Sequence, residues 1–137
     1  MSKTLYLLRS VSGAGKTTLA KLLEESLPNA IALAADDYHY DSDGNYNWKS
    51  ENLYAGHQWC KGVVKESMKQ LYENIIVHNT NTTVKEIKPY LALADKYNYR
   101  VVSLIVENLH GSDSIHNVPS EVRDKQEERL RNSLKLQ

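Results

Sequence analysis

Several features are scarce in this sequence, and each absence excludes a class of protein. The single cysteine, Cys60, cannot form an internal disulfide, which favours a cytosol-like, cytoplasmic location. No long apolar run precedes the first predicted strand, so we expect neither a signal peptide nor a membrane-spanning helix. The 17 acidic and 17 basic side chains cancel, so no net field would draw the protein onto nucleic acid or an anionic membrane. Any site for a polyanion must therefore be local.

The residues that are present fit one globular domain. A chain of 137 residues with 41% hydrophobic and 25% charged side chains is expected to bury roughly two thirds of its unfolded surface around one core. We find no internal repeat, no linker and no feature that specifies an oligomeric state. Residues 1–137 are therefore predicted to form a single domain.

Apolar runs and helical periodicity alternate along the chain. Strands are predicted at residues 4–8, 30–35, 74–81 and 99–108. Helices are predicted at residues 16–27, 49–72, 83–96 and 120–134, the last of them very polar. This alternation predicts an α/β fold in which about four parallel strands are sandwiched between helices, with the functional loops at the carboxyl ends of the strands.

Two details of the predicted helices depend on single residues. The first helix is expected to place Leu19, Leu22, Leu23 and Leu27 on one apolar face. Pro89 lies near the start of the third helix, where it is expected to begin the helix or to bend it.

The stretch RSVSGAGKTTLA, residues 9–20, follows the first predicted strand and opens the first predicted helix. A helix N-terminus carries free N–H groups and a partial positive charge, so a glycine-rich turn there can place donors around phosphate oxygens. Against the pattern G-x-x-x-x-G-K-[ST], Gly15, Lys16 and Thr17 match, whereas Ser10 stands at the first glycine. A chance glycine turn that merely caps a helix is the alternative. The strand before it and the amphipathic helix after it favour a nucleotide site.

The phosphate-loop motif assigns a role to each matching residue. Lys16 is expected to bridge the β- and γ-phosphates of ATP, and the Thr17 hydroxyl is expected to hold Mg²⁺. Ser10 is expected to be tolerated if it adopts the backbone angles that glycine usually takes there. The nucleotide-binding residues are predicted to be Ser12, Gly13, Ala14, Gly15, Lys16, Thr17 and Thr18.

Three further blocks follow the glycine-rich loop: ALAADDYHYDSDGNYNW, LYAGHQWC and IIVHNTNTTVKEIKPYLALADKYNYRVV. Together with that loop they resemble the small P-loop ATP-binding proteins related to polynucleotide 5′-hydroxyl kinases. The resemblance covers about residues 4–120 and rests on the spaced set of blocks, since each block alone is weak. It implies a P-loop kinase-like fold that uses ATP and Mg²⁺.

The resemblance also implies a catalytic base. In these kinases the first aspartate after the second strand takes the proton of the acceptor hydroxyl, which corresponds to Asp36. A carboxylate within hydrogen-bond reach can do this while Mg²⁺ and lysine neutralise the developing charge. The alternative is that Asp36 or Asp37 only caps a turn. Asp37 is a possible contact to the acceptor or the lid, although its carboxylate is expected to point away from the position of a base.

The chain departs from the family pattern at two positions. Where the D-N-T-N loop of the family places its aspartate, this chain has His78, followed by Asn79 and, after Thr80, by Asn81. In the lid, Asp113 replaces the arginine of an R-N-x-H-x-V block, and His116 is kept. Both changes bear on catalysis more than on nucleotide binding.

Residues 107–120 are rich in small and polar residues and are predicted to form a mobile lid loop. His78, Asn79, Asn81 and His116 are candidate contacts to the acceptor or the lid. The lost lid arginine could be replaced from the last helix by Arg123, or by Arg129 or Arg131, although a charged helical face is more often only solvated.

Three other groups of residues could carry a function. Tyr38 and its aromatic neighbours (Tyr40, Tyr46 and Trp48) could stack on a base of the acceptor, although packing explains such residues at least as often. His57 and Cys60 lie one helical turn apart, but no second ligand pair appears at zinc spacing, so helix packing is the better interpretation. The stretch DSDGN lacks ligands at the first and last positions of a calcium loop.

The sequence as a whole favours an ATP-dependent phosphotransferase. Its acceptor is expected to be a hydroxyl group on a nucleic-acid 5′ end or a nucleoside-like molecule. Two alternatives remain: an NTPase or nucleotide-dependent switch without an acceptor, and a non-catalytic, pseudokinase-like binding module. Asp36 favours the first hypothesis, whereas His78 and Asp113 favour the alternatives.

Overall fold

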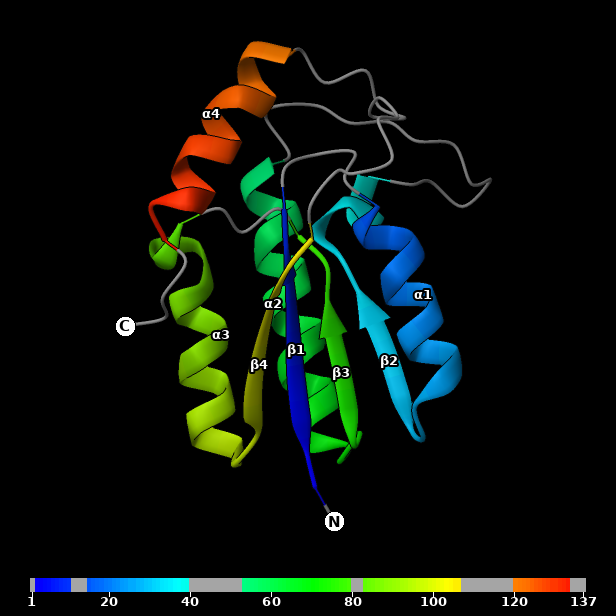
Figure 1. Ribbon diagram of the computed structural model, residues 1–137. Coiled ribbons are helices and arrows are strands. Elements are labelled where there is room, and N and C mark those ends of the chain that lie inside the picture. The colour runs from blue at the N-terminus through cyan, green and yellow to red at the C-terminus, as the bar shows by residue number, and fades with distance from the viewer. Residues whose placement is uncertain (1, 11–14, 40–52, 80–82, 107–119, 134–137) are drawn as a thin grey trace.

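Four parallel strands form the sheet, and their order in space differs from their order in the sequence. In the computed structural model the strands are β1 (Thr4–Arg9), β2 (Ala30–Leu33), β3 (Asn74–Val77) and β4 (Arg100–Ile105). They lie side by side in the order β2-β3-β1-β4 (Figure 1). The structure describes residues 2–10, 15–39, 53–79, 83–106 and 120–133. Within these ranges the predicted α/β fold with four parallel strands is confirmed.

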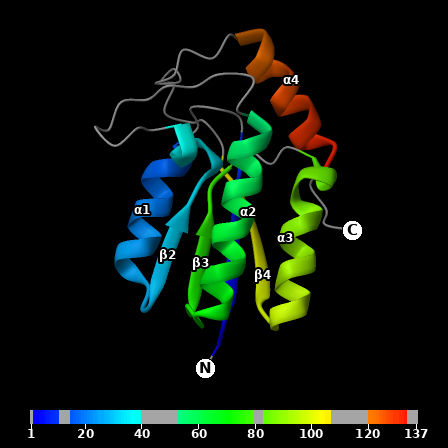
Figure 2. The same ribbon diagram turned by 180° about the vertical axis from the view of Figure 1, so that it is seen from behind.

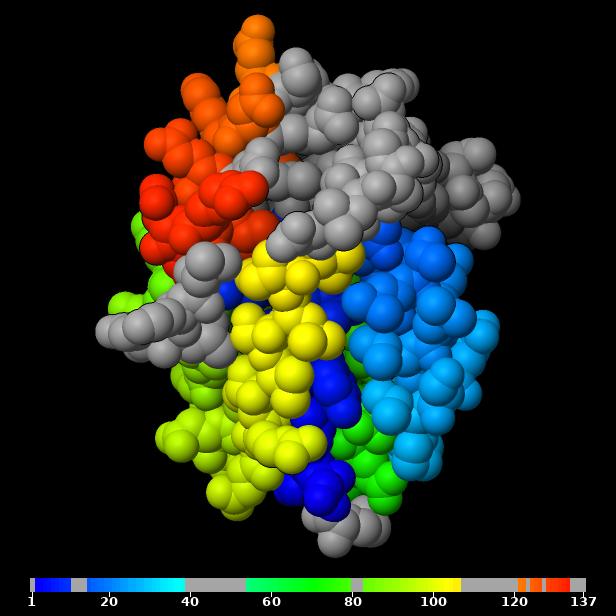
Figure 3. Space-filling view, in the orientation of Figure 1, coloured from blue at the N-terminus to red at the C-terminus, as the bar shows by residue number. Residues whose placement is uncertain are grey.

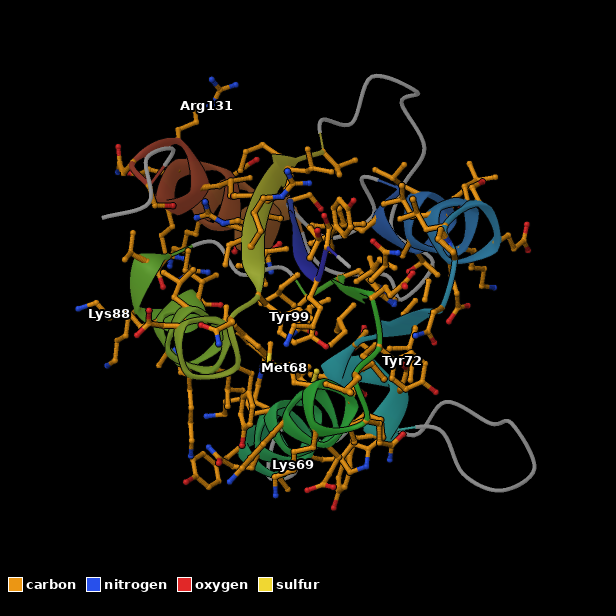
Figure 4. All side chains as sticks on the ribbon, turned by 90° about the horizontal axis from the view of Figure 1, so that it is seen from below. Met68, Lys69, Tyr72, Lys88, Tyr99 and Arg131 are labelled. Atoms are coloured by element: carbon orange, nitrogen blue, oxygen red, sulfur yellow. The ribbon has the colours of Figure 1, made fainter. Side chains whose placement is uncertain are left out.

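Helices cover both faces of this sheet. They are α1 (Lys16–Ser26), α2 (Leu53–Lys69), α3 (Val84–Tyr97) and α4 (Ser120–Arg131), and a short 3-10 helix, η1 (Ala35–His39), follows β2. Seen from behind and from below, α2 and α3 lie on one face and α1 on the other (Figures 2 and 4). None of the helices in the described ranges combines the length and apolar character needed to cross a membrane.

The central strand β1 supplies side chains to both layers of the core, because successive residues of a strand point to opposite faces. Leu5 and Leu7 pack toward α2 and α3, whereas Leu8 packs with Ala20 of α1, and all four are fully buried. The larger layer also contains Leu33, Ala35, Cys60, Val64, Met68, Ile75, Val77, Ile87, Tyr90, Ala94 and Tyr99. The predicted burial of β1 on both faces is therefore confirmed.

The core is closed at the end of the sheet where the strands begin. Figure 4 shows Met68 of α2 and Tyr99, which precedes β4, in the interior, whereas Lys88 and Arg131 point outward. The Tyr99 hydroxyl donates a hydrogen bond to the backbone carbonyl of Tyr72 at 2.5 Å, which links the start of β4 to the turn after α2. The end of the sheet where the strands begin is thus filled by core side chains. The functional loops follow the opposite end, where the strands stop.

Local capping explains the bounds of α3. The Thr83 hydroxyl accepts a hydrogen bond from the Glu86 amide at 3.3 Å and donates one to the Glu86 carboxylate at 3.0 Å, as expected of a helix start. Asn98 ends the helix in the left-handed region, at φ 62°. Pro89 lies inside the helix, so it does not begin it. The helix continues past the backbone donor that Pro89 lacks.

The structure corrects two expectations about this part of the chain. Leu22 was expected on the buried face of α1, yet it is 55% exposed. The buried stripe of the helix is centred on Leu19, Ala20 and Leu23, and at 100° per residue Leu22 falls at its margin. The second predicted strand ends at Leu33, and the chain then turns into η1.

A buried arginine at the end of β1 is bonded to Ser133, which follows the last helix. In Figure 3, β4 lies at the surface on the α1 side of the molecule, and its residues are mostly half-buried. Arg9, at the end of β1, is fully buried. Its Nη2 donates to the Ser133 hydroxyl at 2.7 Å, and its Nη1 donates to the Ser133 carbonyl at 3.1 Å. Burial lowers the pKa of Arg9, and the Glu86 charge opposes this.

Replacing Ser133 by alanine is expected to destabilise the fold. The change removes an oxygen that a buried guanidinium uses, and such a loss costs about 1–3 kcal/mol. Urea denaturation of Ser133→Ala should show this decrease in the free energy of unfolding. Ser103→Ala is the control, because the Ser103 hydroxyl lies 3.5 Å from Nη1 of Arg9, at the limit of a hydrogen bond. Equal stabilities of the two variants would contradict the assignment.

Candidate functional site

The candidate site lies at the edge of the sheet where the strands end. The neighbouring strand ends are held in register, since the His78 amide donates to the Leu33 carbonyl at 3.0 Å and the Val106 amide donates to the Arg9 carbonyl at 2.8 Å. The segments after β1, β2 and β3 therefore start side by side. In a parallel sheet this is the edge where ligands bind.

The start of α1 has the local features of an anion site. Gly15, the residue before the helix, has φ 97°, a value that favours glycine. Within the described residues no side chain caps this end, and the first turn carries no acidic residue. Thr17 and Thr18 are exposed there. The first amides of α1 and its positive dipole end are thus left for a ligand, as a phosphate requires.

Lys16 is the first residue of α1 and is half-buried. Burial lowers the pKa of its ammonium to about 8, and the Asp36 charge opposes that decrease. A lysine in this environment is still mostly protonated at neutral pH but is poorly solvated. An anionic partner would stabilise the charged ammonium, because it would replace the lost hydration.

The turn after β2 distinguishes the two neighbouring aspartates. One carboxylate oxygen of Asp37 accepts a hydrogen bond from the Ala34 amide at 3.1 Å, and the Asp37 amide donates to the Ala34 carbonyl at 3.1 Å. Asp37 thus closes its own turn, in agreement with the expected difference between the pair. Desolvation raises the pKa of Asp37, and the bond from Ala34 opposes this. Asp36 is exposed, and its charge acts on both Lys16 and His78.

His78 immediately follows β3 and is half-buried beside the same charges. Burial lowers the pKa of its imidazole to about 4. The Lys16 charge lowers it further, whereas Asp36 opposes the decrease. The ring is therefore neutral at physiological pH. Lys16, Asp36 and His78, which come from three separate segments, form one electrostatically coupled cluster.

The low pKa of His78 predicts a pH dependence of stability. The folded state takes up this proton only near pH 4, whereas the unfolded chain takes it up near 6.5. Stability should therefore fall as the pH is lowered from 6.5 to 4, by up to about 3 kcal/mol from this group. His78→Asn should lose that part of the slope in urea denaturation across this range. An unchanged slope would show that His78 is solvated in the fold.

Ser10, which replaces the first glycine of the motif, is fully buried. It was expected to be tolerated if it could adopt the backbone angles that the loop requires. Among the described residues, the non-glycine residues with positive φ are Asn29, Leu71 and Asn98. Ser10 is not one of them, so its backbone lies outside the region that favours glycine.

Tyr38 and Trp59 form an exposed aromatic pair next to the cluster. Tyr38 lies in η1, two residues after Asp36, and Trp59 lies on α2. Their ring centroids are 6.1 Å apart with an interplanar angle of 49°, and they are 42% and 37% exposed. The sequence alone did not single out Trp59. The tryptophan of the LYAGHQWC block could have indicated it, but periodicity does not show which face of a helix meets η1.

Asn79, the residue after His78, is buried together with its side-chain amide. Its Oδ1 accepts a hydrogen bond from the Ala35 amide at 2.7 Å, and its Nδ2 donates to the Tyr90 hydroxyl at 3.2 Å. Asn79 was predicted as a candidate contact to the acceptor or the lid. In the structure its polar atoms instead face the protein interior.

Several predicted residues lie outside the described part of the chain. These are Ser12, Gly13, Ala14, Asn81, Asp113 and His116, with residues 107–119 of the predicted lid. The side chain of Arg123 also lies outside it, although its backbone belongs to α4.

The described residues do not form a protein-only metal site. No group of three His, Cys, Asp or Glu side chains in the described ranges could hold a metal ion. Cys60 is fully buried, and burial raises the pKa of its thiol, which agrees with a packing role. The donors present near the start of α1 are the Thr17 hydroxyl and the Asp36 carboxylate. This set fits Mg²⁺, which is usually bound through few protein oxygens together with substrate phosphates.

The strand order and the glycine-capped helix after β1 define a class of protein, the P-loop nucleotide-binding proteins with a kinase-like fold. The sequence profile of the family described as the AAA domain matches residues 5–109. The chain belongs to this family.

Solved structures share this fold. A chain of the Pnkp1/Rnl/Hen1 RNA repair complex superposes with a TM-score of 0.77 at 16% identity, over 97% of this chain and 45% of that one. The APS kinase CysC of Mycobacterium tuberculosis has a TM-score of 0.56 at 10% identity, over 95% of this chain and 98% of that one. The predicted resemblance to P-loop kinase-like proteins is confirmed.

Curated relatives match a shorter stretch. Human NEDD4-binding protein 2 is 39% identical over 98 residues, which are 72% of this chain and 6% of that protein. The 2',3'-cyclic-nucleotide 3'-phosphodiesterase of Rattus norvegicus is 28% identical over 100 residues, 73% of this chain and 23% of that protein. The chain therefore spans less than a quarter of the length of these relatives.

Proposed function

We propose that the protein transfers the γ-phosphoryl group of ATP to a hydroxyl group of a nucleic-acid 5′ end or a nucleoside-like molecule. The observation that carries this proposal is the coupled cluster of Lys16, Asp36 and His78 at the start of α1. A cation for phosphate, a carboxylate for a proton and a neutral ring lie at one edge of the sheet. At neutral pH Lys16 is mostly protonated and His78 is neutral.

In this reaction the acceptor oxygen forms a bond to the γ-phosphorus, and the bond from that phosphorus to the β–γ bridging oxygen breaks. ADP leaves, and the Asp36 carboxylate takes the hydroxyl proton. Lys16 binds the phosphates and neutralises the charge that develops on the leaving oxygen. His78 is neutral, so it can accept or donate one hydrogen bond without competing with Lys16 for the phosphate charge.

Mg²⁺ would be held by the Thr17 hydroxyl together with phosphate oxygens. When bound, it supplies charge neutralisation between the β- and γ-phosphates. His78 replaces the aspartate of the related kinases, so this chain provides one carboxylate fewer for the ion. We expect a weaker dependence on metal identity and a higher Mg²⁺ requirement than in a protein with an aspartate there.

The aromatic pair supports a nucleoside-bearing acceptor. Tyr38, two residues after Asp36 in η1, and Trp59, on the neighbouring α2, are both partly exposed and in contact. A base stacked on such a surface contributes about 1–3 kcal/mol, largely regardless of its identity. A small footprint of this kind is consistent with a chain that has no net charge, because a long nucleic-acid contact needs many cations.

Two alternatives follow from the replaced residues. A nucleotide-dependent switch or NTPase would keep Lys16 and the glycine-capped helix but use water in place of an acceptor. A pseudokinase-like module would bind ATP without turnover, which the loss of the aspartate at His78 and of the lid arginine at Asp113 favours.

One experiment separates the three functions. The protein is incubated with Mg²⁺ and γ-labelled ATP over a panel of 5′-hydroxyl DNA, 5′-hydroxyl RNA, nucleosides and simple alcohols such as glycerol. Label on a nucleic acid or nucleoside supports the proposal. Free phosphate alone would identify an NTPase, and bound ATP without release would identify a binding module. Lys16→Met, run in parallel, excludes a contaminating kinase.

Replacing Trp59 by alanine is expected to raise the KM for the acceptor about 5- to 50-fold, because base stacking is lost. The KM for ATP should change less than about 3-fold, because Trp59 lies on α2 and not on α1, which carries Lys16. Initial rates measured against each substrate check this. Tyr54→Ala is the control, since Tyr54 is the more exposed aromatic residue of α2, at 75%. A similar KM in both variants would exclude stacking on Trp59.

A further inference from the structure

Asn79, which lies shortly after β3, contacts residues of η1, α2 and α3. Its partner in η1 is the residue before the candidate base, Asp36. Asn79 lies immediately after His78, and 6% of its surface is exposed. Its Oδ1 accepts a hydrogen bond from the Ala35 amide at 2.7 Å, and Ala35 is the residue before Asp36. The Nδ2 group donates to the Tyr90 hydroxyl of α3 at 3.2 Å and lies 3.9 Å from the Cys60 sulfur of α2.

The partners of Asn79 fix the orientation of its amide. The Ala35 amide can only donate, so Oδ1 must face it and Nδ2 must face Tyr90 and Cys60. Burial raises the pKa values of both Tyr90 and Cys60, so the phenol and the thiol stay neutral. A buried network with neutral and satisfied members holds one geometry, because an unmade bond in it would cost the full desolvation of the group.

The segment that this network holds is weak by itself. η1 has five residues, and short 3-10 helices have poor hydrogen-bond geometry. Asp37 closes the turn locally, through its bonds to Ala34. That local closure shapes the turn but does not attach it to the rest of the fold. The bond from Ala35 to Asn79 attaches it, one residue from Asp36, to the end of β3 and to the two helices behind it.

We infer that Asn79 is a positioning residue that holds the Asp36 carboxylate at the reacting edge of the sheet. This inference rests on the proposed function, in which Asp36 takes the hydroxyl proton. A misplacement of about 1 Å at a reacting group can cost about 10²-fold in rate. Asn79 is therefore required for transfer although its side chain faces away from the substrates.

The test is a double-mutant cycle. Asn79→Leu keeps the approximate volume and removes both hydrogen-bonding functions. In the parent it should lower kcat about 10- to 100-fold and change the KM for ATP less than about 3-fold. In the Asp36→Asn background the same change should lower kcat less than about 3-fold, since no base is left to misplace. An equal loss in both backgrounds would overturn the inference.

A second measurement does not depend on activity. Hydrogen exchange of the Ala35 amide should be at least about 10-fold faster in Asn79→Leu than in the parent, whereas the Leu5 amide in β1 should be unchanged. Unchanged Ala35 exchange would overturn the inference even if the enzyme is active. If the parent protein transfers no phosphate, the proposed function fails while faster Ala35 exchange still establishes that Asn79 anchors η1.

A milder variant guards against misfolding. Tyr90→Phe keeps the ring of a core residue and removes only the oxygen that accepts from Nδ2 of Asn79. It should lower kcat about 2- to 10-fold in the parent. In the Asp36→Asn background it should have little effect on kcat, as for Asn79→Leu. If Asn79→Leu does not fold, a Tyr90→Phe effect that persists without Asp36 would overturn the inference.

Discussion

Replacing Lys16 by methionine is expected to lower the affinity for ATP at least about 100-fold, the largest effect on binding of any single change in the chain. The ammonium is half-buried at the start of α1, and burial lowers its pKa to about 8, so it is a cation prepared to bind phosphate. Methionine keeps the apolar stem and removes the charge. Calorimetric titration with Mg²⁺-ATP measures the loss, and Lys21→Met, at an exposed position of the same helix, should bind within about 3-fold of the parent.

The pKa of Lys16 adds two consequences. ATP affinity should fall as the pH is raised through about 8, because the deprotonated amine no longer attracts phosphate. The folded-state pKa is lower than the ordinary value of 10.5, so the charged lysine costs stability below pH 8. Lys16→Met should therefore be at least as stable as the parent at neutral pH. A variant that binds ATP like the parent, or that unfolds, would refute the assigned role.

Replacing Asp36 by asparagine is expected to slow phosphoryl transfer by roughly 10²- to 10⁴-fold, the usual contribution of a positioned acid–base group. Affinity for ATP should stay within a few-fold, because the glycine-capped helix and Lys16 are untouched. Single-turnover transfer from γ-labelled ATP, measured beside calorimetric binding, separates the two effects.

Asp37→Asn is the matched control for that experiment. An asparagine oxygen can still accept the hydrogen bond from the Ala34 amide, so the turn is kept and transfer should fall less than about 5-fold. If both variants transfer phosphate as fast as the parent, Asp36 is only a turn residue. If Asp36→Asn also loses ATP binding, the carboxylate holds Mg²⁺ in place of acting as a base.

The periodic and motif-bearing parts of the fold could be predicted from the sequence. The apolar run of β1 and the pattern around Gly15 and Lys16 depend on neighbours in the chain, so they predict a strand, a phosphate loop and a helix in the right order. The third helix, predicted to begin at residue 83, likewise begins at Val84 in the structure. These features could be predicted because they depend on residues that are close together in the sequence.

The remaining features depend on contacts between distant residues. Nothing near Arg9 in the sequence indicates that its guanidinium is buried against Ser133. Asn79 reads as a polar loop residue, and its burial follows only from the meeting of β3, η1, α2 and α3. In the sequence, nothing distinguishes Trp59 from the other aromatic residues. Its contact with Tyr38 depends on the packing of η1 against α2.

The strand order β2-β3-β1-β4 also constrains how the protein folds. β1 is made first, but it pairs with β3 and β4, whose first paired residues are Asn74 and Arg100, and β2 pairs with β3. No two strands of this sheet can therefore join before the ribosome has released the chain through β3. Such non-local pairing slows folding and leaves apolar segments exposed in the meantime. Leu5, Leu7 and Leu8 must stay unpaired through that interval, so β1 is the strand of this sheet that waits longest for a partner.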